Sequence, residues 1–293
     1  MNTRVFFLTL LAMIAFASNS LLCRAALKHT GIDAASFTFI RVFSGAIALG
    51  MIVIVRSSFS SLVTRHSSLR SGNWPSALAL FAYAAGFSFA YKSLSAGTGA
   101  LLLFGAVQAT MILWSFREGE RLDAVQILGV VVAVGGLIVL VFPGLSAPPL
   151  AGSVLMLGAG VAWGIYSVRG KHAGDAIAAT CGNFLRAVPL AALASIVAVA
   201  STRFDSLGLV YAVISGAITS GLGYVIWYSA LTELKSTSAA TVQLSVPVLA
   251  ATGGILFLGE PITLRYVFAS LGVLGGIALV VIEKNRAPSD SRS

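Results

Sequence analysis

The sequence predicts an all-α integral membrane protein with ten transmembrane helices, which form two five-helix repeats of inverted topology. Hydrophobic residues make up 57% of the 293 residues, and charged residues make up only 10%. Soluble proteins carry about 25% charged residues, because their surfaces need solvation. Lipid must therefore be the solvent for most of this surface. Two further observations, a series of long apolar windows and an internal repeat, predict the number and arrangement of the helices.

Ten apolar windows are each close to the length of about 20 residues that crosses a bilayer. The connections between them are mostly short, so neighbouring helices are expected to run antiparallel. We place the boundary between the repeats after residue 145, which gives a first repeat at 1–145 and a second at 146–293. The windows lie at 4–23, 33–55, 74–91, 97–115, 124–142, 150–168, 177–200, 207–230, 236–258 and 264–282.

The distribution of Lys and Arg predicts the orientation of the chain in the membrane. With the N-terminus inside, the cytoplasmic connections and termini hold 12 of the 19 basic residues, and the outer connections hold 5. Cytoplasmic loops of membrane proteins are enriched in Lys and Arg. We therefore expect a multi-pass protein of the bacterial inner membrane, the plasma membrane of the cell, with both termini in the cytoplasm. Basic loops also account for the net charge of +9 without a nucleic-acid partner.

Residues of the first half recur in the same order in the second half. The matched pairs are Arg24 with Arg169, Phe39 with Phe184, Arg41 with Arg186, Tyr91 with Tyr228, Leu94 with Leu231, Gly119-Glu120 with Gly259-Glu260, and Gly135-Gly136 with Gly275-Gly276. Each unit holds five helices, an odd number, so the second unit enters the membrane from the opposite face. Inverted repeats are typical of transporters in which one half rocks against the other around a site near the midplane.

The end of the second repeat contains the most specific motif. Pro247 lies within the window at 236–258, which is followed by Gly259-Glu260-Pro261. With this motif, Trp163-Gly164 and two arginines inside helices, the chain resembles the drug/metabolite transporter superfamily, specifically its EamA-type ten-helix members. The resemblance covers nearly the whole chain. It implies alternating-access transport of small organic solutes.

The first repeat departs from the family pattern at three places, one of which is Arg117-Glu118-Gly119-Glu120 in place of a plain apolar run into Gly-Glu. It reads Ser18-Asn19 where the second repeat reads Trp163-Gly164, and Val107-Gln108 where the second reads Pro247-Val248. These changes bear on the substrate and not on the fold. The aromatic residues of the windows at 74–91 and 207–230 are most similar to those of aromatic amino-acid exporters of the YddG type.

Aromatic side chains in three of the expected helices are candidate substrate contacts. Tyr83, Phe87 and Tyr91 recur every four residues and therefore share one face of their helix. Packing inside the bundle or a belt at the membrane interface would use the same residue types. Their symmetric occurrence in inverted helices favours a cavity. The other aromatic candidates are Trp163, Tyr166, Tyr224, Trp227 and Tyr228.

Uncharged polar side chains within the apolar windows are the second group of candidate contacts. An amide in hydrocarbon is costly unless it is hydrogen-bonded, so such residues face either a neighbouring helix or a wet cavity. Amides, hydroxyls and ring faces together would suit a zwitterion with a hydrophobic side chain. The polar candidates are Asn19, Ser20, Gln108, Gln243 and Ser245.

Four charged residues are expected to have structural roles. Arg41 and Arg186 lie well inside their windows, where they either pin neighbouring helices or meet a substrate carboxylate. Glu120 and Glu260 are matched by the repeat and lie at helix ends. Pro247 interrupts the hydrogen bonding of its helix and is expected to act as a hinge.

These observations favour transport over catalysis. No metal-ligand spacing, acidic cluster or phosphate-binding loop occurs, so we expect neither an enzyme nor a cofactor. We expect an exporter of amino acids, aromatic ones first, working by facilitated diffusion because no carboxylate or histidine lies in the middle of an apolar window.

Other readings remain open at this stage. A multidrug carrier and a nucleotide-sugar or other metabolite carrier are the alternatives within the superfamily, and a lipid-handling or sensory membrane protein is the alternative outside transport. Gly272 and Gly276 form a small-residue face that serves either helix packing or a dimer contact, so we expect a monomer or a homodimer.

Overall fold

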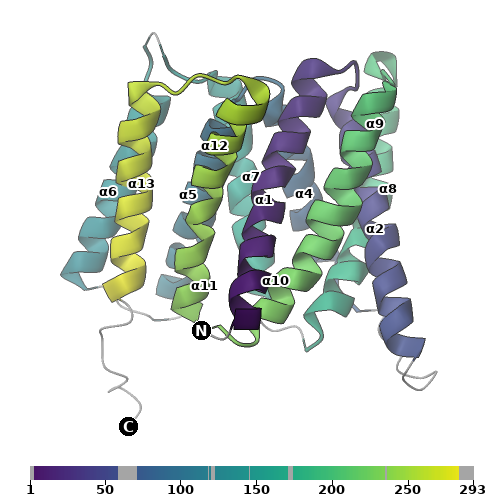
Figure 1. The fold of residues 1–293 in the computed structure, drawn as a ribbon, viewed down its shortest axis with the longest axis horizontal. Coiled ribbons are helices and arrows are strands. Elements are labelled where there is room, and N and C mark those ends of the chain that lie inside the picture. Colours follow the sequence, from purple (N-terminus) through teal and green to yellow (C-terminus); the bar gives the residue numbers. More distant parts are fainter. Residues whose placement is uncertain are drawn as a thin grey trace.

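The fold is a bundle of helices in a computed structural model, which describes residues 3–58, 71–117, 119, 123–144, 146–170, 174–234 and 236–283. Every regular element within these ranges is a helix, and the long helices run roughly side by side (Figure 1). α6 and α13 lie at one edge of the bundle, and α2 and α8 lie at the other.

The first half of the chain forms continuous helices, whereas two spans of the second half are interrupted. The first half contains α1 (Thr3–His29), α2 (Ala34–Ser58), α4 (Trp74–Tyr91), α5 (Ala96–Arg117) and α6 (Ala124–Val141). The second half contains α7 (Leu150–Gly170), α8 (Ala176–Val197), the short 3-10 turn η1 (Val199–Ser201), α9 (Ser206–Val213), the π-helical η2 (Ile214–Leu222), α10 (Gly223–Leu231), α11 (Ser236–Gln243), α12 (Ser245–Leu258) and α13 (Leu264–Glu283).

Among the described residues, nine helical stretches are long and apolar enough to cross a membrane, and α4 is the tenth expected span. α4 opens with Trp74 and Pro75 and carries Tyr83 and Tyr91, and these residues lower its hydropathy. It packs inside the bundle against α7 and α8, where a polar face does not meet lipid. The architecture confirms the predicted all-α membrane fold.

Equivalent helices of the two halves make equivalent contacts. α6 packs against α13 and α2 against α8, so equivalent helices of the two halves meet directly. α7 packs against α4 and α5, as α1 packs against the equivalent segments α9–α10 and α12. α1 begins and α13 ends on the same face of the bundle (Figure 1). This arrangement confirms the predicted pair of inverted repeats.

The glycines of α13 pack against α6 within the chain. A Cβ atom on Gly136 would lie 2.8 Å from the backbone nitrogen of Val273, and one on Gly272 would lie 3.1 Å from the Cα of Gly136. Gly276 approaches the backbone of Gly129 in the same way. Small residues let two helix backbones come close together in a membrane. The small-residue face of α13 therefore serves helix packing inside the chain.

Two spans of the second half depart from regular α-helix. The expected helix at 207–230 contains the π-helical η2, and the expected helix at 236–258 is broken at Leu244. Pro247 has no N–H to donate to the carbonyl of Gln243, four residues earlier, so the break falls one turn before the proline. A hinge motion at Pro247 stays a prediction.

Candidate functional site

A cavity of about 1130 Å³ lies between the two halves. α1, α4 and α5 of the first half and α7, η2, α10 and α11 of the second contribute to its wall. It reaches the face where α1 begins, because the exposed Arg4, Arg56 and Asp175 belong to its lining. It stops inside the bundle at the buried Asn19 and Ser20. We call the end at Arg4, Arg56 and Asp175 the open end, and the end at Asn19 and Ser20 the sealed end.

Ten of the thirteen predicted contact residues line this cavity. They come from helices of both halves that the repeat makes equivalent, and the four-residue period of α4 places two of them on one face. That they bind a substrate stays a prediction. They are Asn19, Ser20, Tyr83, Phe87, Gln108, Trp163, Tyr224, Trp227, Tyr228 and Gln243.

Tyr91 was also predicted as a contact but lies beyond the sealed end. Its hydroxyl donates to the backbone carbonyl of Ala96 at 3.2 Å, and its ring packs closely on Gly99. The side chain is completely buried. The helical period identifies the face on which a residue lies, but it does not reveal how far along the helix the cavity extends.

Tyr166 and Ser245 also lie outside the cavity wall. Tyr166 sits behind Trp163, with the two ring centroids 5.2 Å apart, and its hydroxyl is 3.4 Å from that of Thr180. The Ser245 hydroxyl donates to the backbone carbonyl of Val242 at 2.6 Å, across the break between α11 and α12. In this structure, both side chains contact neighbouring groups of the bundle and not the cavity.

Trp163 is at the centre of the aromatic part of the wall. Its ring centroid lies 4.8 Å from that of Tyr83 and 5.2 Å from that of Tyr224, with which it is stacked. Phe16 completes the cluster at 5.8 Å from Tyr224 and 6.0 Å from Trp227. Phe16 is not among the predicted contacts, although it lies one turn before the polar residues of α1 and therefore on their face.

A hydrogen-bonded network of polar side chains forms the sealed end. Ser215 and Thr219 donate to Oδ1 of Asn19 at 2.6 and 3.2 Å, and Nδ2 of Asn19 donates to the hydroxyl of Tyr83 at 3.4 Å. Nη2 of Arg41 donates to the same hydroxyl at 2.9 Å. Ser215 and Thr219 are not among the predicted contacts, although their four-residue spacing within an apolar window places them on one helix face.

Arg24 and Glu260 form a buried ion pair between the two halves beyond the sealed end. Nε of Arg24 lies 2.9 Å from Oε1 of Glu260, and both side chains are almost inaccessible. Nη1 of Arg24 also donates to the carbonyls of Tyr91 and Lys92 at 2.9 and 3.2 Å. Oε2 of Glu260 accepts from the backbone nitrogen of Ala96 at 2.7 Å. We call this pair the latch.

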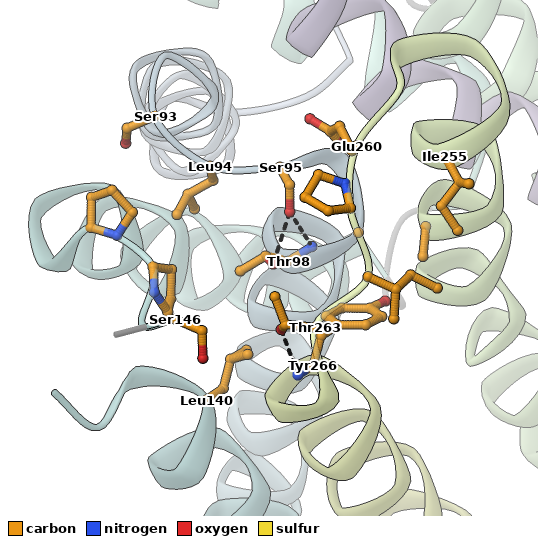
Figure 2. A pocket seen from close by; sticks show the side chains of 16 residues that line it. Ser93, Leu94, Ser95, Thr98, Leu140, Ser146, Ile255, Glu260, Thr263 and Tyr266 are labelled. Carbon is orange, nitrogen blue, oxygen red and sulfur yellow. Dashed lines mark hydrogen bonds between the residues drawn. The ribbon is translucent and has the colours of Figure 1, made fainter. Parts of the chain in front are cut away.

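The turn that carries Glu260 depends on a glycine. Gly259 ends α12 with a φ of +60°, a left-handed conformation that glycine adopts without strain. Figure 2 shows the neighbourhood of this turn, where a separate pocket of about 190 Å³ lies between the α4–α5 connection and the segment before α13. In that pocket the Ser95 hydroxyl donates to that of Thr98 at 2.9 Å.

The residues predicted as structural charges have different surroundings. Arg186 donates to the backbone carbonyls of Ser71 and Gly182 at 2.8 and 2.9 Å, which ties α8 to the segment before α4. Arg41 instead bonds a side chain of the cavity wall. Glu120 lies outside the described residues.

Two ion pairs cross the mouth of the cavity at the open end. Arg4 lies 3.8 Å from Glu233, and Arg56 lies 3.7 Å from Asp175. Each pair joins the first half to the second, and all four side chains are at least 40% exposed. Water therefore screens both pairs.

Comparisons with known proteins agree with this architecture. The sequence pattern of the EamA-like transporter family matches the chain twice, at residues 3–142 and 150–282. An uncharacterized protein of Pseudomonas aeruginosa is 54% identical over 280 residues, which are 96% of this chain and 95% of that protein. A crystal structure with 17% sequence identity superposes with a TM-score of 0.67 over 98% of this chain and 100% of its own, which shows the fold alone.

Other relatives carry a transporter or exporter name. The uncharacterized transporter YoaV of Bacillus subtilis is 23% identical over 250 residues, which are 82% of this chain and 85% of YoaV. The threonine/homoserine exporter RhtA of Escherichia coli is 35% identical over 147 residues, which are 47% of this chain and 48% of RhtA.

Proposed function

We propose that this chain, which belongs to the EamA-like transporter family, exports amino acids across the bacterial inner membrane, with aromatic amino acids preferred. The chain is a multi-pass membrane transporter. One observation carries the proposal: a cavity between inverted halves is open at one end, while a buried ion pair between the halves lies beyond the other. Alternating access needs such an arrangement, because a substrate site must never open to both sides at once.

The chemistry of the wall supports an amino acid as the substrate. Stacked rings of Trp163 and Tyr224 provide an apolar surface that also attracts cations. The amides of Gln108 and Gln243 lie on the same wall and can bond both charged groups of a zwitterion. The resemblance of half the chain to RhtA, a threonine/homoserine exporter, also favours amino acids over drugs or nucleotide sugars.

Facilitated diffusion is the proposed mode of transport. Proton-coupled carriers need a group that gains and loses a proton near the middle of the membrane. The acidic residues among the described lining of the cavity are Asp175 and Glu233, and both lie at the exposed mouth. Glu260 is held in the latch with Arg24. Export would therefore follow the amino-acid gradient.

Direction and organisation belong to the same proposal. The excess of basic residues that the sequence predicts for the cytoplasmic connections supports cytoplasmic termini and, because α1 begins at the open end, an open end that faces the cytoplasm. The proposed boundary between the functional halves stays after residue 145, in the connection between α6 and α7. One copy of the chain holds the whole cavity, so a monomer would suffice for transport.

Counterflow in proteoliposomes tests the proposed substrate class. Vesicles that contain the purified chain are preloaded with one unlabelled amino acid and then receive a trace of the same labelled compound. We expect accumulation for phenylalanine, tyrosine or tryptophan and less for small polar amino acids. The matched variant is Gln243→Ala, which removes an amide from the cavity wall and should reduce the accumulation of the labelled amino acid. If no amino acid in a full panel gives counterflow, the proposed substrate class is wrong.

Ion coupling is tested with the same vesicles. A proton or sodium gradient is imposed with equal amino-acid concentrations on both sides, and net movement is followed over time. We expect none, since the described cavity offers no carboxylate or histidine near its sealed end. Net accumulation driven by either ion would contradict facilitated diffusion while leaving the substrate class intact.

A further inference from the structure

Arg41 is a buried positive charge that lies one side chain behind the cavity wall. Its residue surface is only 2% exposed. Its guanidinium carbon lies 5.2 Å from the ring centroid of Tyr83 and 4.7 Å from that of Phe87. Both rings line the cavity, whereas Arg41 does not. The charge is therefore close enough to act on a ligand at the sealed end without contacting it.

This charge has fewer partners than a buried guanidinium needs. Nη1 of Arg41 is buried and has no hydrogen-bond partner, and no described carboxylate lies within 4.0 Å of the side chain. Removing a charge from water is costly unless an opposite charge or sufficient hydrogen bonds replace the water. Two ring faces and one phenol compensate only in part. The region would be stabilised by a negative charge in the cavity.

The repeat provides an internal comparison for Arg41. Its equivalent in the second half, Arg186, donates to two backbone carbonyls and ties α8 to the segment before α4. A purely structural role for both arginines would predict similar surroundings in the two halves. Arg41 instead donates to the hydroxyl of a residue on the cavity wall. The two halves have therefore diverged at this pair of equivalent arginines.

The hydrogen bonds around Tyr83 direct its own proton towards the cavity. Its oxygen accepts from Nη2 of Arg41 at 2.9 Å and from Nδ2 of Asn19 at 3.4 Å. A phenol has one O–H to donate and can accept two hydrogen bonds. With both accepting positions occupied by donors from the protein, the O–H is left to donate to a group in the cavity. Arg41 polarises that O–H, which makes it a stronger donor to an anion.

We infer that Tyr83 and Arg41 form the carboxylate-recognising end of the cavity. Tyr83 donates its hydroxyl hydrogen to a carboxylate oxygen of the substrate, and Arg41 is a specificity-determining residue that supplies positive potential through Tyr83. The sealed end consequently selects small molecules with a carboxylate over the corresponding amides and amines. The inference rests on the proposed function in treating the cavity as the substrate route, but its test does not require transport.

Equilibrium binding to the purified full-length chain in detergent tests this inference. Trp163 and Trp227 line the cavity, so selective excitation of tryptophan reports binding there. The probes are L-phenylalanine, L-phenylalaninamide, which lacks the carboxylate, and phenylpropionate, which lacks the amine. Because a hydrogen bond to a charged group is the difference, we expect the two carboxylates to bind about 10- to 100-fold more tightly than the amide.

Variants assign this preference to the two residues. Tyr83→Phe and Arg41→Gln should both reduce the preference for carboxylates to near one, with the affinity for the amide little changed. Arg41→Lys should retain part of it, because the charge remains. Arg186→Gln is the matched control and should keep the full preference. If Arg41→Gln does not fold, Tyr83→Phe, which removes only one oxygen, decides the question.

The outcomes separate this inference from the proposed function. Equal affinity of the unmodified chain for carboxylates and amide, no binding of any probe, or an unchanged preference in Tyr83→Phe overturns the inference even if amino acids are transported. A preference that depends on Tyr83 and Arg41 supports it even if no amino acid gives counterflow, in which case the substrate is a carboxylate of another kind.

Discussion

Ion pairs join the two halves at both ends of the cavity, but they are buried at one end and exposed at the other. Beyond the sealed end, the ion pair between Arg24 and Glu260 is 2.9 Å long and buried, whereas at the open end the pair between Arg4 and Glu233 is 3.8 Å long and exposed. An exposed pair contributes at most about 1 kcal/mol. Removing one partner of a buried pair costs roughly 3–5 kcal/mol, because the other charge is left without compensation. Burial, and not the presence of opposite charges, therefore determines which end is held shut.

The internal repeat also relates the arginines at the two ends of the cavity. Arg169 is the sequence equivalent of Arg24, yet it donates to neutral oxygens, those of Ser76 and Asn73, each at 3.2 Å. Within the described part of the chain, no carboxylate lies within 4.0 Å of Arg169. Equivalent arginines in unlike surroundings show that the two halves adopt different arrangements at the two ends. Exchange of those arrangements is the motion that an inverted repeat permits.

Breaking the latch should have the largest effect. Glu260→Met leaves Arg24 buried without a counter-charge, which costs roughly 3–5 kcal/mol. We expect the sealed end to open, so that a cysteine placed at Leu103 in the cavity, in a chain without Cys23 and Cys181, becomes reactive to an impermeant maleimide from the outer side. Labelling rates in oriented vesicles measure the effect.

Two further variants sharpen the test of the latch. The double variant Arg24→Met, Glu260→Met replaces both charges and should restore much of the protection, because no uncompensated charge remains. Lys92→Ala is the control, since its exposed side chain lies at the same end but outside the pair. If Glu260→Met leaves Leu103→Cys as protected as before, the latch does not hold this end closed.

Tyr91 and Trp163 should differ in the property that they affect. Tyr91 is fully buried beyond the cavity, so Tyr91→Ala should cost roughly 3–5 kcal/mol of stability. Trp163 faces the cavity, so Trp163→Ala should reduce counterflow at least about tenfold, the effect of losing roughly 1.4 kcal/mol of binding energy. Melting temperature and transport are measured for both, with the exposed Trp74→Ala as a control. The opposite pattern would exclude Trp163 from the binding site.

The assignment of the two ends to the two sides of the membrane is open to direct test. We expect a cysteine at Ser146 to react only from outside and one at Ser68, which lies outside the described residues, to react only from the cytoplasm. The reason is that the predicted cytoplasmic connections and termini hold 12 basic residues, against 5 in the predicted outer connections. The reverse labelling would mean that the described conformation is open to the outside.

The smallest effect is expected at the open end. Asp175→Asn removes the charge that faces Arg56 but keeps a side-chain oxygen that can cap α8. Because the pair is exposed, the change should alter stability by less than about 1 kcal/mol. Thermal unfolding at low and high salt measures it. A large, salt-independent loss would indicate that the mouth is more enclosed than its exposure implies.

Much of the candidate site could be predicted because aromatic and amide residues in apolar windows are conspicuous. Asn19, Gln108 and Gln243 are costly in lipid wherever they lie, so their need for a partner or a cavity follows from chemistry alone. Phe16 and Ser215 were missed because side chains of their types are ordinary in membrane helices. Tyr91 was predicted as a contact and lies beyond the sealed end, since periodicity carries no information about depth.

The sequence by itself determined the membrane environment, the spans and the inverted repeat, because apolar length, charge distribution and internal similarity are properties of the chain read along its length. Only the tertiary structure decided which charges meet. Arg24 and Glu260 are 236 residues apart, and Arg41 and Tyr83 are 42 apart. Whether a buried arginine finds a carboxylate, a carbonyl or a phenol depends on the packing of helices from different parts of the chain, and this packing also sets where the cavity ends.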